Sequence, residues 1–188
     1  YDQQGCFAPH VFFVERGGAA PPDLFAYYLA HELSAFEKRF PRRTLSLGEA
    51  SSVAAWRHQE EMAADSQVFG DPEGAWSVSY HATGGGFSPS SLNRAIRVVA
   101  VDALAEVPPL VAPYRTLLQT VGIAAPPREL FTLAAALGQA GITRVAALGD
   151  MTAPEAGWHH DGRFNLLDLV QITEIDGRAT TAADRLAY

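Results

Sequence analysis

Apolar residues recur along the chain at spacings that predict a long helix near its start. The stripe begins after Pro22 and ends before Pro41, and its members stand three or four positions apart, as one face of a helix requires. They are Phe25, Leu29, Leu33, Phe36 and Phe40. This spacing predicts an amphipathic helix over residues 22–40.

Two further segments carry helix signals at their ends. Ser46 and Glu49 form a capping-box pattern, in which each side chain accepts from the other residue's backbone N–H, and it predicts a helix that runs to Ala64. A second helix is expected over residues 126–141, because two prolines open it and apolar residues follow on one face. Gly141 stands where a helix end favours left-handed backbone.

Shorter apolar runs between the helices predict strands. Val11 to Val14 is a continuous apolar run, whereas Trp76 to Tyr80 alternates apolar and polar residues, as a half-buried strand does. Three more strands are expected at 94–101, 120–123 and 142–148, with a short helix at 114–118. Since strands alternate with helices, the expected fold class is α/β, with a mostly parallel sheet flanked by helices.

The composition narrows the class of protein. Hydrophobic residues make up 48% of the 188 residues and charged residues 19%, a balance typical of an ordered globular domain. The net charge of −7 disfavours binding to nucleic acid, which needs clustered Lys and Arg. No apolar run reaches the ~20 residues of a membrane helix, so we expect a cytoplasmic protein without a membrane span. Because the chain starts without methionine, we expect it to be cut from a longer polypeptide.

The chain contains one cysteine, Cys6, so no internal disulfide can form. A lone cysteine is most often a small buried apolar residue, and that alternative stays open. Its neighbours favour a reactive thiol. Gly5 permits an unusual backbone turn, and Pro9 suits the first turn of a helix whose N-terminus would stabilise a thiolate. Cys6 is therefore a candidate nucleophile.

Several segments resemble one known family, in the order in which they occur along the chain. Residues 5–15 and the helix that follows them resemble the nucleophile loop, strand and helix of the aldehyde dehydrogenase superfamily. Four strings are similar to the fatty acyl-CoA reductases of bacterial luminescence systems and their non-luminescent relatives. They are Asp2-Gln3-Gln4-Gly5-Cys6, Ser88-Pro89-Ser90-Ser91-Leu92-Asn93-Arg94, Leu118-Gln119-Thr120-Val121-Gly122 and Gly157-Trp158-His159-His160-Asp161-Gly162.

The resemblance implies an aldehyde dehydrogenase-type catalytic domain over residues 1–176, a C-terminal tail over 177–188, and a Rossmann-like cofactor domain upstream of this chain. It implies that Cys6 takes an acyl group, expected to be a fatty acyl group, from a coenzyme A thioester. It also implies that NADPH supplies the hydride that releases an aldehyde. The Cys6 backbone N–H is the oxyanion donor that this chain would contribute. Contacts to the cofactor are not carried over, because residues 91–94 replace the segment that holds the superfamily's ribose-binding glutamate.

The same resemblance implies substrate contacts and partners. A segment with two histidines replaces the loop that lines the substrate tunnel in the superfamily. The substrate-binding residues implied are Gln4, Gly5, Phe7, His159 and His160. The implied partners are an acyl-CoA or acyl-carrier thioester, an acyl-protein synthetase, and further copies of the chain in a homo-oligomer.

Other residues have a simpler interpretation beside the chemical one. No metal is expected at residues 159–161, because adjacent residues seldom converge on one ion and no further Cys or His stands at ligand spacing. A turn led by Asp161 and Gly162 is expected there instead. His10 stands four residues after the cysteine and is a candidate base, or else a packing residue. The glycines at 84–86 lack the flanking elements of a phosphate loop and predict a flexible loop. The stretch 57–61 is interpreted as a solvated helix face.

Two other functions stay open at this point. An aldehyde-oxidising, NAD(P)-dependent dehydrogenase would use the same cysteine and would need a glutamate base upstream of this chain. A noncatalytic oligomerisation or interaction module would instead bury Cys6 as an inert thiol.

Overall fold

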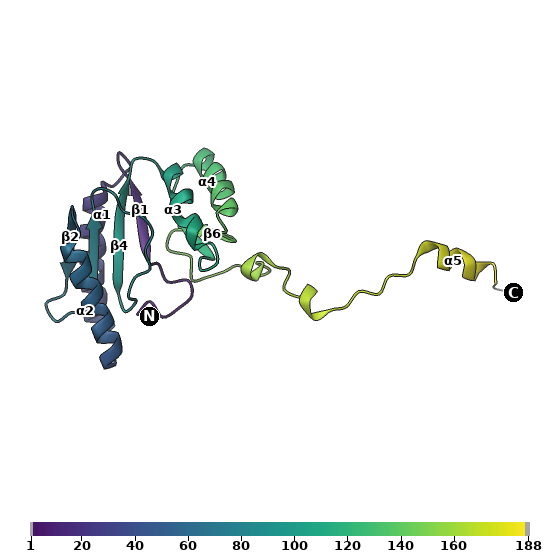
Figure 1. Cartoon of the computed structure of the whole chain (residues 1–188), viewed down its shortest axis with the longest axis horizontal. Helices are drawn as coiled ribbons and strands as arrows, with labels where there is room; N and C mark the ends of the chain where they lie inside the picture. The colour runs from purple at the N-terminus through teal and green to yellow at the C-terminus, as the bar shows by residue number, and fades with distance from the viewer. Residues whose placement is uncertain (1, 187–188) are drawn as a thin grey trace. The chain divides into compact units, whose positions relative to one another are not determined.

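The computed structural model describes residues 2–186, which form two units that divide after Pro154. The first unit holds every strand of the described chain and four of its α-helices, while the second is an extended segment with short helical turns and one helix (Figure 1). None of the described helices is long and apolar enough to cross a bilayer.

A four-stranded sheet forms the centre of the first unit. Its strands are β1 (Val11–Glu15), β4 (Ala95–Val101), β3 (Ser77–His81) and β2 (Ser66–Gly70), in that order across the sheet. β4 pairs in parallel with both β1 and β3, and β2 runs antiparallel at the edge. A second, parallel pair is formed by β5 (Thr120–Ile123) and β6 (Arg144–Ala147). The α/β prediction is confirmed, with a sheet that is mixed because of β2.

β2 is the strand that the hydrophobic pattern does not reveal. Val68 and Phe69 are its adjacent apolar residues, so it shows no alternation. Its partner β3 holds it in place through five paired residues, from Ser66 opposite His81 to Gly70 opposite Ser77. The pairing therefore comes from the neighbouring strand and not from the local sequence.

Three predicted helices are confirmed with small shifts of their ends. They are α1 (Pro22–Arg39), α2 (Leu47–Met62) and α4 (Pro127–Gln139). Ser46 and Glu49 form the predicted capping box at the start of α2. Gly141 has the expected left-handed backbone, with φ +103°.

The short helix predicted at 114–118 is wrong in position. The helical turns lie earlier, at Leu104–Glu106, α3 (Val107–Val111) and Ala112–Tyr114. Two prolines near the start of α3 hid this helix in the sequence, yet the first helical turn needs no N–H from them.

Both faces of the central sheet are covered, because neighbouring residues of β4 point to opposite sides. Val98 packs with Ala26 and Ala30 of α1 on one face, together with Trp76 and Val78. On the other face Val99 and Val101 pack with residues of α3 and α4, which are Val107, Val111, Leu133 and Leu137. The core therefore holds β4 from both faces of the sheet, and β4 pairs with β1, the strand into which the chain runs after Cys6.

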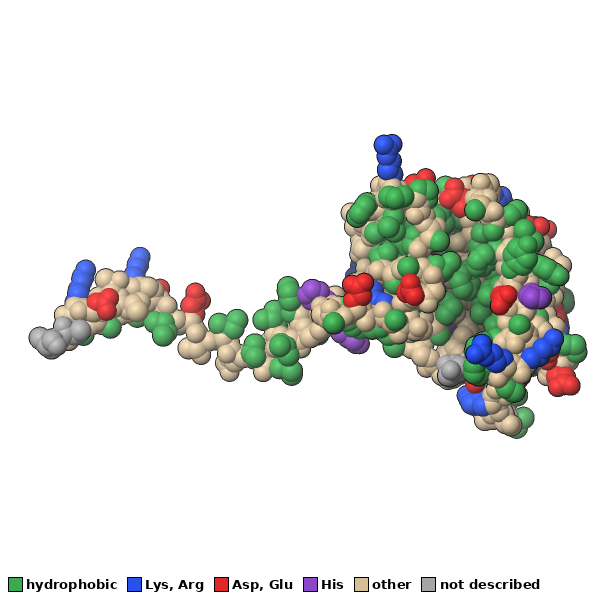
Figure 2. All heavy atoms as spheres, turned by 180° about the vertical axis from the view of Figure 1, so that it is seen from behind, with side chains coloured by type: hydrophobic (Ala, Val, Ile, Leu, Met, Phe, Trp, Pro, Cys, Tyr) green, Lys and Arg blue, Asp and Glu red, His purple; other side chains and the backbone are tan. Residues whose placement is uncertain are grey.

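The second unit contains turns at His160–Gly162 and Leu167–Leu169 and a final helix, α5 (Gly177–Asp184), within the predicted tail. Asp176 caps α5 by accepting from the Arg178 backbone N–H at 2.7 Å. Apolar side chains lie exposed along the segment before this helix (Figure 2). They are Phe164, Leu166, Leu167, Leu169, Val170, Ile172 and Ile175.

Candidate active site

Cys6 lies on a loop that leads into β1, and its side chain is exposed. Cys6 lies within a tight turn, which is closed by a hydrogen bond from the Ala8 backbone N–H to the Gly5 carbonyl at 3.0 Å. A substrate in solution can therefore reach the sulfur. This arrangement meets the first requirement of a nucleophile and does not fit the inert, buried alternative.

One local expectation about this loop is wrong. Pro9 does not open a helix, because the chain passes directly into β1 at Val11, so no helix N-terminus of this segment stabilises a thiolate. Pro9 fits either element, and the β-branched residues beyond it pair with β4. The turn expected at Gly5 is present and needs no left-handed backbone there, whereas Asp2 and Gln3 have such backbone, each with φ 57°.

The predicted substrate residues beside Cys6 have protein contacts of their own. The Gln4 side chain donates to Asn93 Oδ1 at 2.9 Å. The ring of Phe7 lies 5.3 Å from the guanidinium carbon of Arg144, measured to the ring centroid. The structure therefore brings together Gln4, Gly5, Cys6 and Phe7 on one loop, and it adds a cation from β6 next to that loop.

His10 is tied to the loop before β4. Its Nδ1 accepts from the Ser90 backbone N–H at 3.2 Å and lies 3.2 Å from Ser90 Oγ. Its ring meets Phe87 edge-on, with 6.4 Å between centroids. Burial lowers the pKa of His10, so the ring is neutral near pH 7. These contacts favour the packing alternative over a base.

His159 and His160 belong to the second unit. The His159 ring meets Phe164 edge-on at 4.8 Å, and the His160 ring lies 5.0 Å from Trp158. Asp161 and Gly162 both have left-handed backbone, which confirms the predicted turn. Among the side chains that the structure describes, no three of His, Cys, Asp or Glu stand close enough to hold a metal ion. The tunnel-lining role of the two histidines stays a prediction.

A buried charged cluster lies where a solvated helix face was predicted. Arg57 and Glu61 do form an exposed ion pair, but Glu60 between them is only 1% exposed. Its Oε2 accepts from Ser79 Oγ and from His81 Nε2, each at 2.6 Å, and Arg97 pairs with the same carboxylate. Helical spacing was the signal for it, since Glu60 continues the buried stripe that Val53 and Trp56 begin.

The contacts of Glu60 make this cluster a structural one. Burial alone would raise the pKa of Glu60, but hydrogen bonds from His81, Arg97 and Ser79 outweigh it and lower that pKa to about 2. Ser79 and the carboxylate both meet the same ring nitrogen of His81. In a hydrolase triad they would stand on opposite nitrogens. The cluster therefore joins α2 to β3 and β4 and does not activate the serine.

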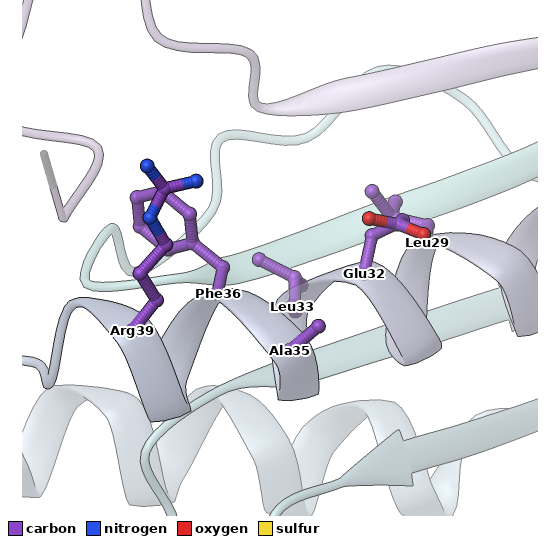
Figure 3. Close-up of a pocket in the computed structure, with 6 residues that line it drawn as sticks. All are labelled: Leu29, Glu32, Leu33, Ala35, Phe36 and Arg39. Carbon is purple, nitrogen blue, oxygen red and sulfur yellow. The ribbon is translucent and has the colours of Figure 1, made fainter.

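A hollow beside α1 lies among residues that were not predicted to be functional (Figure 3). The residues that line it all come from that helix and are Leu29, Glu32, Leu33, Ala35, Phe36 and Arg39. None of the predicted site residues contributes to it. The Cys6 loop is therefore the better candidate for the reacting site.

The comparison with known families bears on nearly the whole chain. The family described as acyl-CoA reductase (LuxC) matches residues 1–172. The chain belongs to the LuxC family. The match includes the Cys6 loop, the segment before β4 and the two histidines of the second unit, so it covers every string on which the sequence resemblance rested. No curated protein matches the chain. The LuxC family is one of acyl-CoA reductases, which supports that activity for this chain.

Proposed function

We propose that this chain is the thiol-bearing half of a fatty acyl-CoA reductase, and that Cys6 carries the acyl group between coenzyme A and hydride. The observation that carries the proposal is the exposed thiol on a turn within the LuxC family match. Thiolates are the most nucleophilic of the common side-chain groups, and covalent transfer divides one difficult step into two easier ones.

The acyl transfer needs the Cys6 thiol and the thioester. The thiol loses its proton to water, its sulfur attacks the thioester carbon, the carbon–sulfur bond to coenzyme A breaks, and coenzyme A leaves as its own thiolate. The negative charge on the carbonyl oxygen needs a donor in this step, and the Cys6 backbone N–H is the donor that we assign. The acyl group then rests on Cys6 as a new thioester.

The hydride is assigned to a cofactor domain upstream of this chain. The glycine loop at 84–86 does not fit the phosphates of a dinucleotide, because a Cβ on Gly85 would stand 2.7 Å from a Val99 methyl and the loop packs on β4 at this point. NADPH held by that domain would supply hydride to the acyl carbon, and the aldehyde would leave as its bond to the Cys6 sulfur breaks.

The covalent step is tested with Cys6→Ser in the enzyme that includes its cofactor domain. We expect the wild type to release one equivalent of coenzyme A from acyl-CoA without NADPH, and the variant to release none, because serine lacks an activating base here. Ser52→Ala, an exposed hydroxyl on α2, is the matched control and should behave as wild type. Aldehyde production by Cys6→Ser at the wild-type rate would exclude the covalent route.

The aldehyde-oxidising alternative differs from the proposed reductase in the product that leaves Cys6. An oxidising enzyme would hydrolyse the acyl-cysteine with water and return a carboxylic acid. The family match favours reduction. Mass spectrometry of the product formed from acyl-CoA and NADPH distinguishes an aldehyde from an acid.

A further inference from the structure

The loop that carries Cys6 is closed at its base by one side chain. Gln3 lies three residues before the cysteine and Pro9 three residues after it. The Gln3 side-chain amide donates to the Pro9 carbonyl at 2.8 Å. With the turn between Gly5 and Ala8, this bond holds both ends of the loop together.

The oxygen and the nitrogen of the same amide both bond to the backbone of Ala95, the first residue of β4. The Ala95 backbone N–H donates to Gln3 Oε1 at 2.8 Å, and Gln3 Nε2 donates to the Ala95 carbonyl at 3.1 Å. The Arg97 backbone N–H donates to the His10 carbonyl at 3.3 Å, and Ala95 lies two residues before Arg97, so the backbone groups of both residues face the β1 side. The Gln3 amide bonds the N–H and the carbonyl of Ala95, and so extends the hydrogen bonding of β4 beyond the start of β1.

A second anchor lies one residue earlier. Arg94 Nε donates to Asp2 Oδ1 at 2.8 Å, and its guanidinium also pairs with Glu37 and donates to the Phe40 carbonyl at 2.8 Å. The Arg94 side chain is 4% exposed and lies over the Phe36 ring. This buried cation therefore ties the residues before Cys6 to the end of α1.

The two segments that these bonds join, residues 2–3 and 92–94, have backbone that non-glycine residues rarely adopt. Asp2 and Gln3 have φ near 57°, and Leu92, Asn93 and Arg94 have φ between 55° and 68°. Such backbone is strained and persists only where the surroundings hold it. The Asn93 backbone N–H donates to the Asp2 carbonyl at 3.1 Å, so the two strained segments hold each other.

We infer that Gln3 is a positioning residue for Cys6, held in turn by the contact of Arg94 with Asp2. The inference rests on the proposed function of the thiol. An exposed loop presents a nucleophile accurately only if its base is fixed, and a displacement of about 1 Å can cost about 100-fold in rate. Gln3 touches no reacting atom in this arrangement and acts through the loop.

The test compares Gln3→Glu and Gln3→Met, both close to glutamine in length, in the enzyme with its cofactor domain. Each removes the N–H groups that reach Pro9 and Ala95. We expect coenzyme A release in a single turnover to fall about 100-fold, with KM for acyl-CoA within about threefold of wild type. Alkylation of Cys6 by iodoacetamide should stay within about threefold, because a small reagent needs an exposed thiol but no fixed loop. Gln59→Ala, an exposed glutamine of α2, is the control.

The outcomes separate this inference from the function on which it rests. Acyl transfer at the wild-type rate in a folded Gln3 variant, with Cys6→Ser inactive, would overturn the positioning role alone. Activity in Cys6→Ser would overturn the proposed function. A loss of rate that matches the loss of folded protein, measured by circular dichroism on the same samples, would also overturn the positioning role, since each folded molecule would then be fully active.

Discussion

The buried carboxylate of Glu60 gives a prediction for stability against pH. Its folded pKa of about 2 lies below its ordinary value of 4.5, because three hydrogen-bond donors favour the charged form despite burial. This difference corresponds to about 3 kcal/mol of free energy of unfolding. The unfolded chain takes up the proton first as the pH falls. The stabilisation is therefore complete above pH 5 and is lost between about pH 4.5 and pH 2.

Glu60→Gln tests this contribution with little change of volume. The variant leaves the Arg97 cation buried without its carboxylate, and we expect the free energy of unfolding at pH 7 to fall by about 3 kcal/mol. Urea unfolding should show this as a midpoint lower by about 1–3 M. Between pH 5 and pH 2 the variant should also lose about 3 kcal/mol less of its free energy of unfolding than the wild type does.

The control and the refuting result both concern the same helix. Glu61→Gln removes an exposed carboxylate that pairs with Arg57, so we expect a change below about 0.5 kcal/mol. If wild type and Glu60→Gln lose stability in parallel from pH 7 to pH 3, the buried carboxylate is not the source of the pH dependence.

Two further substitutions test local features of the fold by urea unfolding. Ser46→Ala removes the capping box of α2 and should lower the free energy of unfolding by about 1 kcal/mol. An unchanged midpoint would show that the pairing of Ser46 with Glu49 does not stabilise α2. Gly141→Ala places a methyl group 2.6 Å from Arg115 Cβ at a left-handed residue, which should cost about 1–3 kcal/mol. Gly48→Ala, with no atom within 4 Å of the added methyl group in α2, should stabilise instead by up to about 1 kcal/mol.

Part of the site could be predicted from the sequence because its signal is a short string of residues. Cys6 and its neighbours form such a string, and the family match includes it. The roles of Gln3 and Arg94 could not be predicted in this way. Gln3 lies 92 residues from Ala95, and Arg94 lies 92 residues from Asp2. No local spacing indicates which backbone groups a glutamine amide will meet.

The sequence alone determined the elements whose signals lie within one or two helical turns. The stripe of α1, the cap of α2 and the glycine after α4 are of this kind, because side chains three or four residues apart meet on any helix. Only the tertiary structure decided that β2 joins the sheet and that Glu60 is buried. Both depend on partners that folding brings close. A carboxylate prefers water, and it is stable in a buried position only where hydrogen-bond donors surround it.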